Sequence, residues 1–289
     1  MDSRSLQAFL KLSNLLHFGK ASQILHMSPS TLSRTIFQLE EQLGVTLFLR
    51  DNRTVELTRE GNLLKQYALD YFQELEKLEQ SLSNDQGDLQ GSLSIYCSVT
   101  AAQSFLHEAL QAFRRKHPKI EIVLHTGDTN EAVSRILDDQ EDLAIAARAK
   151  RQPNSLSFKL LGETPIIMIA PRDQQKWNIT GFEKAVWENL PVILPETGVF
   201  REQLDKWFST LGFEPLIYAQ VGGNEAIVSM VSLGYGIGFV PKIVVDNSPL
   251  VDQVMILDNR PNIAPIDVGF YAKTKRLKNP LIQALWEAV

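Results

Sequence analysis

A run of short polar side chains between residues 28 and 38 could carry out the most recognisable chemistry in this sequence. Its members are hydroxyl, amide and guanidinium groups on one side of an apolar helical pattern: Ser28, Ser30, Thr31, Ser33, Arg34 and Gln38. Hydroxyls and amides bind phosphates and base edges, and an arginine can bind guanine through two hydrogen bonds. The run therefore predicts a surface that reads DNA, although the solvated face of an ordinary amphipathic helix would have a similar composition.

A helix–turn–helix is needed to hold these groups on one face. Apolar residues recur at helical spacing from residue 32 to residue 43. Ser28 is a suitable N-cap because its hydroxyl can accept from an unpaired backbone N–H, and Pro29 fits the first helical position. Gly44 supplies the left-handed residue that ends such a helix. A shorter helix before His26 completes the pair, and the second helix of this motif lies in the DNA major groove.

A β-hairpin is expected after the second helix. The turn-forming pair Asp51-Asn52 lies between Leu49-Arg50 and the β-prone segment 54–57. Arg50 and Arg53 then flank the hairpin tip, where cations are placed to bind DNA phosphates. With this hairpin the motif becomes a winged helix–turn–helix.

The stretch that follows predicts a long helix with an apolar seam. Thr58 is its expected N-cap, and apolar residues follow at alternating spacings of four and three, the heptad pattern of a coiled coil. The seam consists of Leu64, Ala68, Tyr71, Leu75, Leu78 and Leu82. Such a seam favours a dimer over the alternative, a surface helix on a monomer. Residues 84–88 are expected to form a hinge.

Strands and helices alternate from Leu93 to the C-terminus, which predicts α/β units with parallel strands. Two such series, separated by a break near residue 163, predict two lobes around a ligand-binding cleft. We expect a winged helix–turn–helix over residues 1–58, a coiled-coil linker helix and hinge over 59–90, and an effector-binding domain over 91–289. Lobe I would comprise residues 91–161 and 267–289, and lobe II residues 162–266.

Composition sets limits on function. The 289 residues are 44% apolar and carry a net charge of −5, so bulk charge does not favour general nucleic-acid binding. Residues 1–65 hold eight Lys/Arg and six Asp/Glu, a net +2 that leaves −7 for the remainder. The single cysteine excludes an internal disulfide and suits a reducing cytoplasm. The five histidines show no metal-ligand spacing, and neither a nucleophile elbow nor a P-loop occurs, so we expect no catalytic site, metal or cofactor.

Five motifs in the N-terminal part resemble those of the LysR-type transcriptional regulators. They are Phe18-Gly-Lys-Ala-Ser22, Ser28-Pro-Ser-Thr-Leu-Ser-Arg34, Leu39-Glu-Glu-Gln-Leu-Gly44, Leu47-Phe-Leu-Arg50 and Leu57-Thr-Arg-Glu-Gly61. The resemblance implies a winged helix–turn–helix and linker helix, followed by a two-lobed α/β domain similar to type II periplasmic binding proteins. Thr35 and Gln38 stand where many members carry longer or basic side chains, which leaves the operator preference open.

Within this family the C-terminal part resembles the activators of isoleucine–valine biosynthesis. The matching segments include Cys97-Ser-Val-Thr-Ala-Ala102, Thr126-Gly-Asp128, Asp142-Leu-Ala-Ile-Ala146 and Val228-Ser-Met-Val231. The resemblance implies acetolactate or acetohydroxybutyrate as a small anionic co-inducer. It also implies double-stranded operator DNA, a homodimer that pairs into a homotetramer, and RNA polymerase as partners, with a cytoplasmic location and no membrane association.

The expected effector site lies where strands of the two lobes end. Ser98 and Thr100 follow the first strand and precede a helix, whose N-terminal N–H groups can bind a carboxylate; plain capping by Thr100 is the alternative. The family places residues 126–127 and 197–200 at the cleft. The candidate residues are Ser98, Thr100, Ala101, Thr126, Gly127, Arg148, Thr197, Val199, Phe200, Gly223 and Asn224.

Several of these candidates have simpler interpretations. Arg148, just past a strand end, could bind an anion or could be a solvated surface arginine. Thr126-Gly127 could form only a turn, and Gly223 could form a tight turn before a helix capped by Asn224. Cys97 is expected to be a buried strand residue rather than a redox sensor.

Two other functions remain to be separated from a ligand-responsive regulator. A cytoplasmic enzyme using the interlobe cleft would need a convergent acid–base or nucleophile set, which the sequence does not show. A constitutive DNA-binding protein would use its C-terminal part only to oligomerise. A ligand-dependent rise in melting temperature separates the latter from a regulator, because a ligand that binds only the folded state stabilises it.

Overall fold

The structure is a computed structural model that describes residues 1–50, 54–83, 89–172, 187–212, 214–257 and 261–289. The chain divides into two compact units, residues 1–87 and 88–289. No helix in the described part of the chain is both long and apolar enough to cross a membrane.

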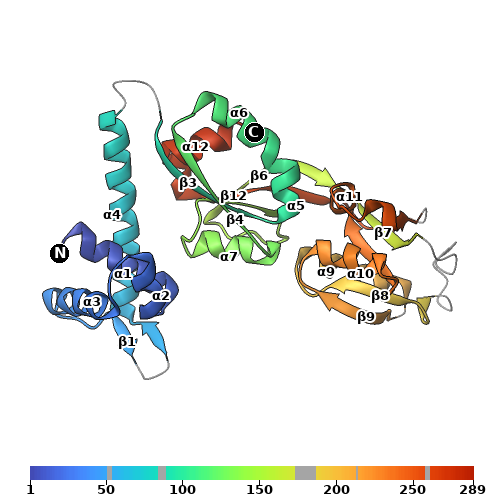
Figure 1. Ribbon diagram of the computed structural model, residues 1–289, viewed down its shortest axis with the longest axis horizontal. Helices are drawn as coiled ribbons and strands as arrows, with labels where there is room; N and C mark the ends of the chain where they lie inside the picture. Colours follow the sequence, from blue (N-terminus) through green and yellow to red (C-terminus); the bar gives the residue numbers. More distant parts are fainter. Residues whose placement is uncertain (51–53, 84–88, 173–186, 213, 258–260) are drawn as a thin grey trace. The chain divides into compact units, whose positions relative to one another are not determined.

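The first unit is a winged helix–turn–helix with a long helix after it, as predicted (Figure 1). Its elements are α1 (Ser3–Leu15), α2 (Phe18–Ile24), α3 (Pro29–Leu43), β1 (Phe48–Arg50), β2 (Val55–Leu57) and α4 (Arg59–Ser83). β1 and β2 pair in antiparallel fashion as the two strands of the wing. Phe9, Leu12 and Phe48 are fully buried in its core, so the wing packs on the helices rather than projecting alone.

The local signals for α3 are confirmed. The backbone N–H of Thr31 donates to the Ser28 hydroxyl at 3.1 Å, Pro29 occupies the first turn, and Gly44 ends the helix with a φ of 67°. At the start of α4, the backbone N–H of Gly61 donates to the Thr58 hydroxyl at 2.8 Å. These caps fix where each helix begins and ends.

The second unit contains two five-stranded sheets, each the centre of one lobe. In lobe I the strand order is β4-β3-β5-β12-β6, with β3 (Gly91–Cys97), β4 (Ile120–Thr126), β5 (Leu143–Ala147), β6 (Leu156–Thr164) and β12 (Ile266–Lys273). The segments α5 (Val99–Ala101), η2 (Ala102–Leu106) and α6 (His107–Lys116) precede β4, and η3 (Thr129–Glu131) and α7 (Ala132–Leu137) follow it. η6 (Thr274–Lys278) and α12 (Pro280–Glu287) end the chain.

Lobe I has helices on both faces of its sheet (Figure 1). Leu93, Ile95 and Cys97 of β3 pack on one face with residues of α6 and α12, whereas Tyr96 packs on the other face with residues of α7. Alternate residues of a strand point to opposite faces, so Leu93, Ile95 and Cys97 share one face of the sheet, and Ser94 and Tyr96 share the other.

Lobe II follows the same plan, with strand order β11-β7-β10-β8-β9. Its strands are β7 (Ile166–Pro171), β8 (Pro191–Pro195), β9 (Leu216–Val221), β10 (Ile237–Pro241) and β11 (Val254–Ile256). Its helical segments are α9 (Val199–Leu211), α10 (Asn224–Ser232), α11 (Lys242–Asp246) and η5 (Val251–Gln253). α9 covers one face through an aromatic cluster that includes Trp187, Trp207 and Phe239, and α10 and α11 cover the other.

Three details differ from the sequence-based expectation. The sheets are mixed rather than purely parallel, because β12 runs antiparallel to β5 and β6, and β7 runs antiparallel to β10 and β11. β6 and β11 were not predicted. The helix expected after Ser98 and Thr100 is interrupted by the π-helical turn η2, and such turns occur often at functional sites.

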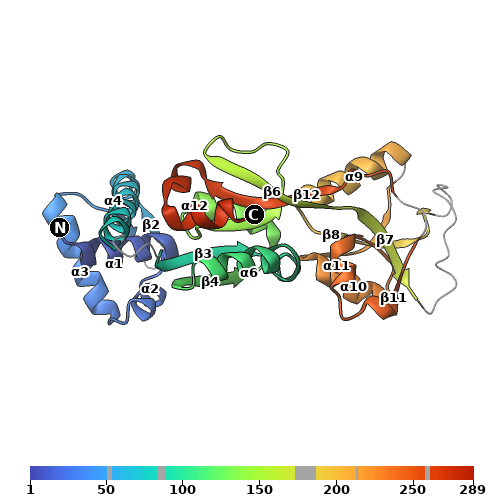
Figure 2. The ribbon, with the colours of Figure 1, turned by 90° about the horizontal axis from the view of Figure 1, so that it is seen from above.

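The chain passes from one lobe to the other near β6 and β12. Figure 2 shows these two strands where the lobes meet. β6 pairs with β12 from Leu156 to Thr164, and Ile266 lies opposite Thr164. The β12 strand therefore begins at the junction and ends deep in lobe I. Residues from both strands line the space between the lobes.

Candidate DNA-reading and effector-binding sites

The predicted DNA-reading groups lie together on the exposed side of α3. Ser28, Ser30 and Thr31 are exposed and form a hydroxyl cluster, with Oγ of Ser28 lying 2.8 Å from Oγ of Ser30 and 2.7 Å from Oγ1 of Thr31. Arg34 and Gln38 are exposed further along the helix, and Ser33 is half-buried. A helix with hydroxyls at its start and a guanidinium one turn later suits major-groove contact.

An aromatic residue that the sequence interpretation omitted lies on this same face. Phe37 is 54% exposed and follows Arg34 by three positions, which places the two on one side of the helix. An apolar side chain in the major groove can contact the methyl group of thymine. An apolar residue within an otherwise polar helix face was the feature of the sequence that could have indicated Phe37.

The wing is fixed to the end of α3 by Glu40. Its Oε1 accepts from the backbone N–H groups of Leu47 at 2.8 Å and Phe48 at 3.2 Å, and its Oε2 accepts from Arg50 at 2.7 Å. The guanidinium of Arg50 also lies over the ring of Phe18, 5.3 Å from its centroid. Arg50 of the wing is thus already paired with Glu40 of α3. Arg53 lies outside the described residues.

The predicted dimer seam requires a correction in its first half. Leu64 and Ala68 are buried against the helices of their own unit, so they are not available to a partner helix. Tyr71 also packs partly against this core, and the side chain of Leu82 lies outside the described residues. Leu78 of the predicted seam is exposed, and so are Leu63 and Tyr67, which were not part of the prediction. Heptad spacing identified an apolar face but not which protein surface covers it.

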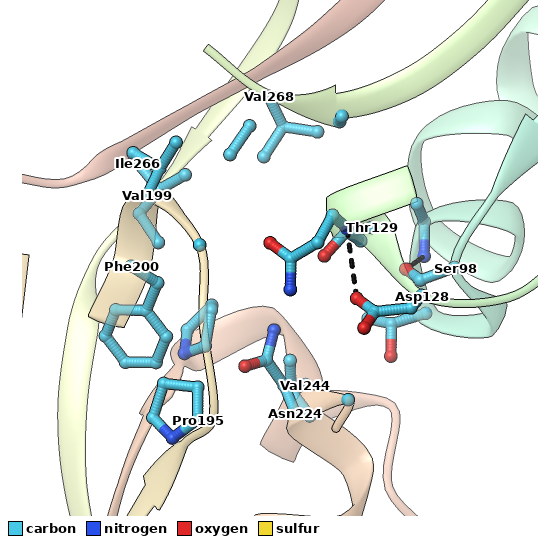
Figure 3. A pocket seen from close by; sticks show the side chains of 18 of the residues that line it. Ser98, Asp128, Thr129, Pro195, Val199, Phe200, Asn224, Val244, Ile266 and Val268 are labelled. Carbon is cyan, nitrogen blue, oxygen red and sulfur yellow. Dashed lines mark hydrogen bonds between the residues drawn. The ribbon is translucent and has the colours of Figure 1, made fainter. Parts of the chain in front are cut away.

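In the second unit, a cavity of about 350 Å³ lies between the two lobes. Figure 3 shows Ser98, Asp128 and Thr129 from lobe I on one side, and Pro195, Val199 and Phe200 from lobe II facing them. Val244, Ile266 and Val268 add apolar surface. The cavity therefore has a polar wall in lobe I opposite a largely apolar wall, the combination that fixes the orientation of a small ligand.

Most predicted effector residues line this cavity. Those brought together there are Ser98, Thr100, Ala101, Thr197, Val199, Phe200, Gly223 and Asn224. Their capping roles differ from the expectation, however. The Ser98 hydroxyl, not that of Thr100, accepts from the backbone N–H of Ala101 at 3.1 Å. Gly223 occupies the N-cap position of α10 without a side-chain cap, so Asn224 is the first residue of the helix and not its cap.

Three predicted residues lie outside the cavity. The Arg148 side chain is 58% exposed, pairs with Asp267 at 3.6 Å, and lies over the ring of Phe158. Thr126 and Gly127 are exposed; Thr126 is the last residue of β4, and Gly127 follows it. A Cβ at Gly127 would lie 2.4 Å from the Tyr96 hydroxyl, so this glycine is needed for a close backbone approach rather than for ligand contact.

The cavity residues that sequence reasoning missed come from distant parts of the chain. Asp128 and Asn130, just beyond the predicted Gly127, replace the predicted pair in the polar wall. Thr164 comes from the unpredicted β6, and Glu225 lies one residue past the predicted Asn224. The turn sequence after Thr126 was the available signal for Asp128; nothing local indicated Thr164.

Hydrogen bonds and an ion pair connect the two lobes around the cavity. The Asn130 amide donates to the Thr197 hydroxyl at 3.1 Å, and Lys150 pairs with Glu202 at 2.8 Å. The Thr100 hydroxyl and backbone N–H both donate to Glu225 Oε1, at 2.5 Å and 3.3 Å. The charged residues among the described lining are Asp128, Glu202 and Glu225, all of them acidic.

Cys97 is buried at the end of β3, as expected. Burial raises the pKa of its thiol to about 11, because desolvation disfavours the thiolate. The thiolate is the reactive form of cysteine, so this residue is poorly suited to redox chemistry near neutral pH. In the described residues, no group of three or more acidic, histidine or cysteine side chains is placed to hold a metal ion.

Comparison with known proteins identifies the family. The family "Bacterial regulatory helix-turn-helix protein, lysR family" matches residues 3–62, and the "LysR substrate binding domain" matches residues 86–289. The chain belongs to the LysR family of transcriptional regulators. Its members are DNA-binding regulators that respond to small molecules and form oligomers, and they are not enzymes.

Individual LysR regulators match over the whole chain. The HTH-type transcriptional regulator IlvY of Escherichia coli is 41% identical over 291 residues, covering 99% of this chain and 98% of that protein. The HTH-type transcriptional activator IlvY of Salmonella typhimurium is also 41% identical, covering 99% of both chains. The crystal structure of full-length CbnR with its target DNA matches with a TM-score of 0.64 at 20% identity, covering 100% of this chain and 99% of that one. At that identity the structural match shows the fold alone.

Proposed function

We propose that this LysR regulator activates isoleucine–valine biosynthesis in response to acetolactate or acetohydroxybutyrate. The full-length identity with the IlvY regulators supports the pathway. The interlobe cavity is the observation that carries the effector site, because hydroxyl groups of lobe I line one part of it and apolar side chains of lobe II line another. Both acids carry a carboxylate, a tertiary hydroxyl and a ketone beside a small alkyl group, which matches this division.

The proposed pose places the polar end of the acid on lobe I. Ser98 and Thr100 would donate hydrogen bonds to the carboxylate or hydroxyl oxygens, and the Asn130 amide offers a further donor. Val199 and Phe200 would cover the alkyl group. The described lining contains no cation, so hydroxyl and N–H donors would recognise the acid without a charged partner.

DNA binding is assigned to α3 and the wing. Arg34 and Gln38 would contact base edges, and the hydroxyls near Ser28 and the arginines of the wing would contact phosphates. In this proposal residues 1–58 bind DNA, residues 59–90 link the two parts, and residues 91–289 bind the effector. A change in how paired dimers are spaced would alter the bend in the DNA and the access of RNA polymerase.

Assembly is proposed to use two kinds of surface. The exposed Leu63, Tyr67 and Leu78 of α4, with Tyr67 stacked on Tyr71, give the long helix an apolar face for a second copy. Each lobe also ends in an edge strand with exposed apolar residues, Leu124 in β4 and Leu216 to Tyr218 in β9. Exposed edges of this kind can pair with another chain.

We expect sedimentation at micromolar concentration to show a dimer or tetramer, and a monomer would contradict the assignment.

Titration of the full-length chain with a panel of acids tests the effector. We expect acetolactate and acetohydroxybutyrate to bind and to raise the melting temperature, because a ligand that binds only the folded state stabilises it. Pyruvate and shikimate serve as controls that share the carboxylate but lack the adjacent hydroxyl–ketone pair. If neither expected acid binds at millimolar concentration, the pathway assignment fails and only the family remains.

A further inference from the structure

We infer that Glu225 is a specificity-determining residue of the effector cavity, because it holds the donors of Thr100 that the carboxylate of an acidic effector needs. The acid and the Glu225 carboxylate therefore compete for one position, and binding of the acid breaks a connection between the lobes. This inference rests on the proposed effector site and adds how that site converts binding into motion.

The geometry supports an exchange at a single place. Glu225 is the second residue of α10 in lobe II, and Thr100 lies in α5 of lobe I. One carboxylate oxygen of Glu225 accepts from both the hydroxyl and the backbone N–H of Thr100. Thr100 is 7% exposed, and both residues line the cavity. Its two donors therefore face the cavity and are occupied by a carboxylate from the opposite lobe.

The other carboxylates of the cavity have different partners. Glu202 pairs with Lys150 at 2.8 Å, and Asp128 accepts from the backbone N–H of Asn130 at 3.0 Å at the start of a short helix. Glu225 has hydrogen bonds to Thr100 but no ion pair with any described residue. Among the described residues, the negative charge of Glu225 is therefore stabilised by the donors of Thr100, which an acidic ligand would require, and by the N-terminus of its own helix, α10.

Two carboxylates cannot share these donors while both are ionised. Like charges a few ångströms apart in a partly desolvated cleft repel strongly. An acid that accepts hydrogen bonds from Thr100 must displace the Glu225 carboxylate. When Glu225 is displaced, the start of α10 loses this connection to lobe I. A neutral ligand could fill the apolar part of the cavity and leave the connection intact. The site thus distinguishes an acid from its neutral analogue by what each does to the lobes.

Calorimetry on the full-length chain tests the exchange. The ligands are 2-acetolactate and acetoin, which keeps the hydroxyl–ketone pair but lacks the carboxylate. The Glu225→Gln substitution keeps the size of the side chain and one oxygen that can accept from Thr100, and it removes the charge. We expect it to tighten acetolactate binding about tenfold or more, because the repulsion disappears, and to change acetoin binding less than about twofold. Asp246→Asn, which removes a lobe II carboxylate paired with Lys242 outside the cavity, should change neither affinity.

A measurement without effector tests the connection itself. Thr100→Val and Glu225→Ala each remove one partner of the same bond, so their effects on the midpoint of thermal unfolding should not add in the double variant. Additive effects would overturn the inference. So would unchanged acetolactate affinity in Glu225→Gln while the unmodified chain binds the acid, an outcome that leaves the proposed function standing. If neither chain binds any acid of the panel, the proposed effector and the exchange are both wrong.

Discussion

Replacing Arg34 by alanine should remove most of the sequence-specific DNA binding of this regulator while leaving its assembly unchanged. Arg34 is exposed near the middle of the polar face of α3. A guanidinium bound to guanine through two hydrogen bonds contributes about 1–3 kcal/mol for each recognition helix that engages DNA. The measurement is the affinity of the full-length chain for a duplex that it selects from a randomised pool, with sedimentation as the check on assembly.

Two further variants separate base reading from charge. Arg34→Lys keeps the charge but cannot form the paired hydrogen bonds, so it should lose discrimination between duplexes and retain non-specific binding. Arg53→Ala, at the hairpin tip predicted from the sequence, should weaken binding to all duplexes alike and flatten the dependence of log affinity on log salt by about one unit. Unchanged affinity for Arg34→Ala and Arg53→Ala across several salt concentrations would show that α3 and the wing do not contact the DNA.

The second large effect is expected at the polar wall of the cavity. Ser98→Ala should weaken binding of the acid about tenfold to a hundredfold, because a hydrogen bond to a charged group is worth about 1.5–3 kcal/mol. Thr100→Ala should weaken it less, because the Thr100 hydroxyl already donates to Glu225 in the chain without effector. Affinity for operator DNA without effector should remain nearly unchanged, since the proposed DNA contacts all lie in the first 58 residues. Calorimetry and DNA binding on the same preparations measure the two quantities separately.

The structure supplies matched controls for this prediction. Thr100→Ser keeps the hydroxyl and should restore most of the affinity lost in Thr100→Ala. Arg148→Ala should leave the acid affinity unchanged, because the Arg148 side chain lies outside the cavity and pairs with Asp267. A large loss in Arg148→Ala with no loss in Ser98→Ala would place the acid elsewhere.

Binding alone does not activate transcription. An effector changes the conformation of the paired dimers only to the extent that it binds one arrangement of the lobes better than the other. A tenfold preference shifts that balance by about 1.4 kcal/mol. Loss of the Glu225–Thr100 connection is one way in which the acid would produce such a preference.

Local signals in the sequence determined the elements of the DNA-binding unit. Ser28, Pro29 and Gly44 fixed the ends of α3, because capping and left-handed termination depend on one or two residues near each end. The alternation of strands and helices likewise gave the α/β class of the second unit. Motif order was sufficient to identify the family, which the comparisons confirm.

The tertiary structure decided which surface covers each apolar face. The seam of α4 has the spacing of a coiled coil, but Leu64 and Ala68 are buried within their own unit. Spacing specifies the direction in which a side chain points, not the partner it meets. The antiparallel direction of β12 could not be predicted for the same reason. A strand that is buried on both faces has the same apolar pattern whether it pairs in parallel or antiparallel fashion.

The cavity depended most on tertiary structure. Ser98 and Thr100 were predicted because the end of a strand before a helix is a local pattern, and Arg148 was misplaced because its rotamer is set by Asp267 and Phe158. Glu225 reaches Thr100 across 125 positions of sequence, and Thr164 and Ile266 reach the cavity through strands that cross between the lobes. The sequence by itself determined that hydrogen-bond donors follow the end of a strand. Only the packing of the two lobes decided which groups lie opposite these donors.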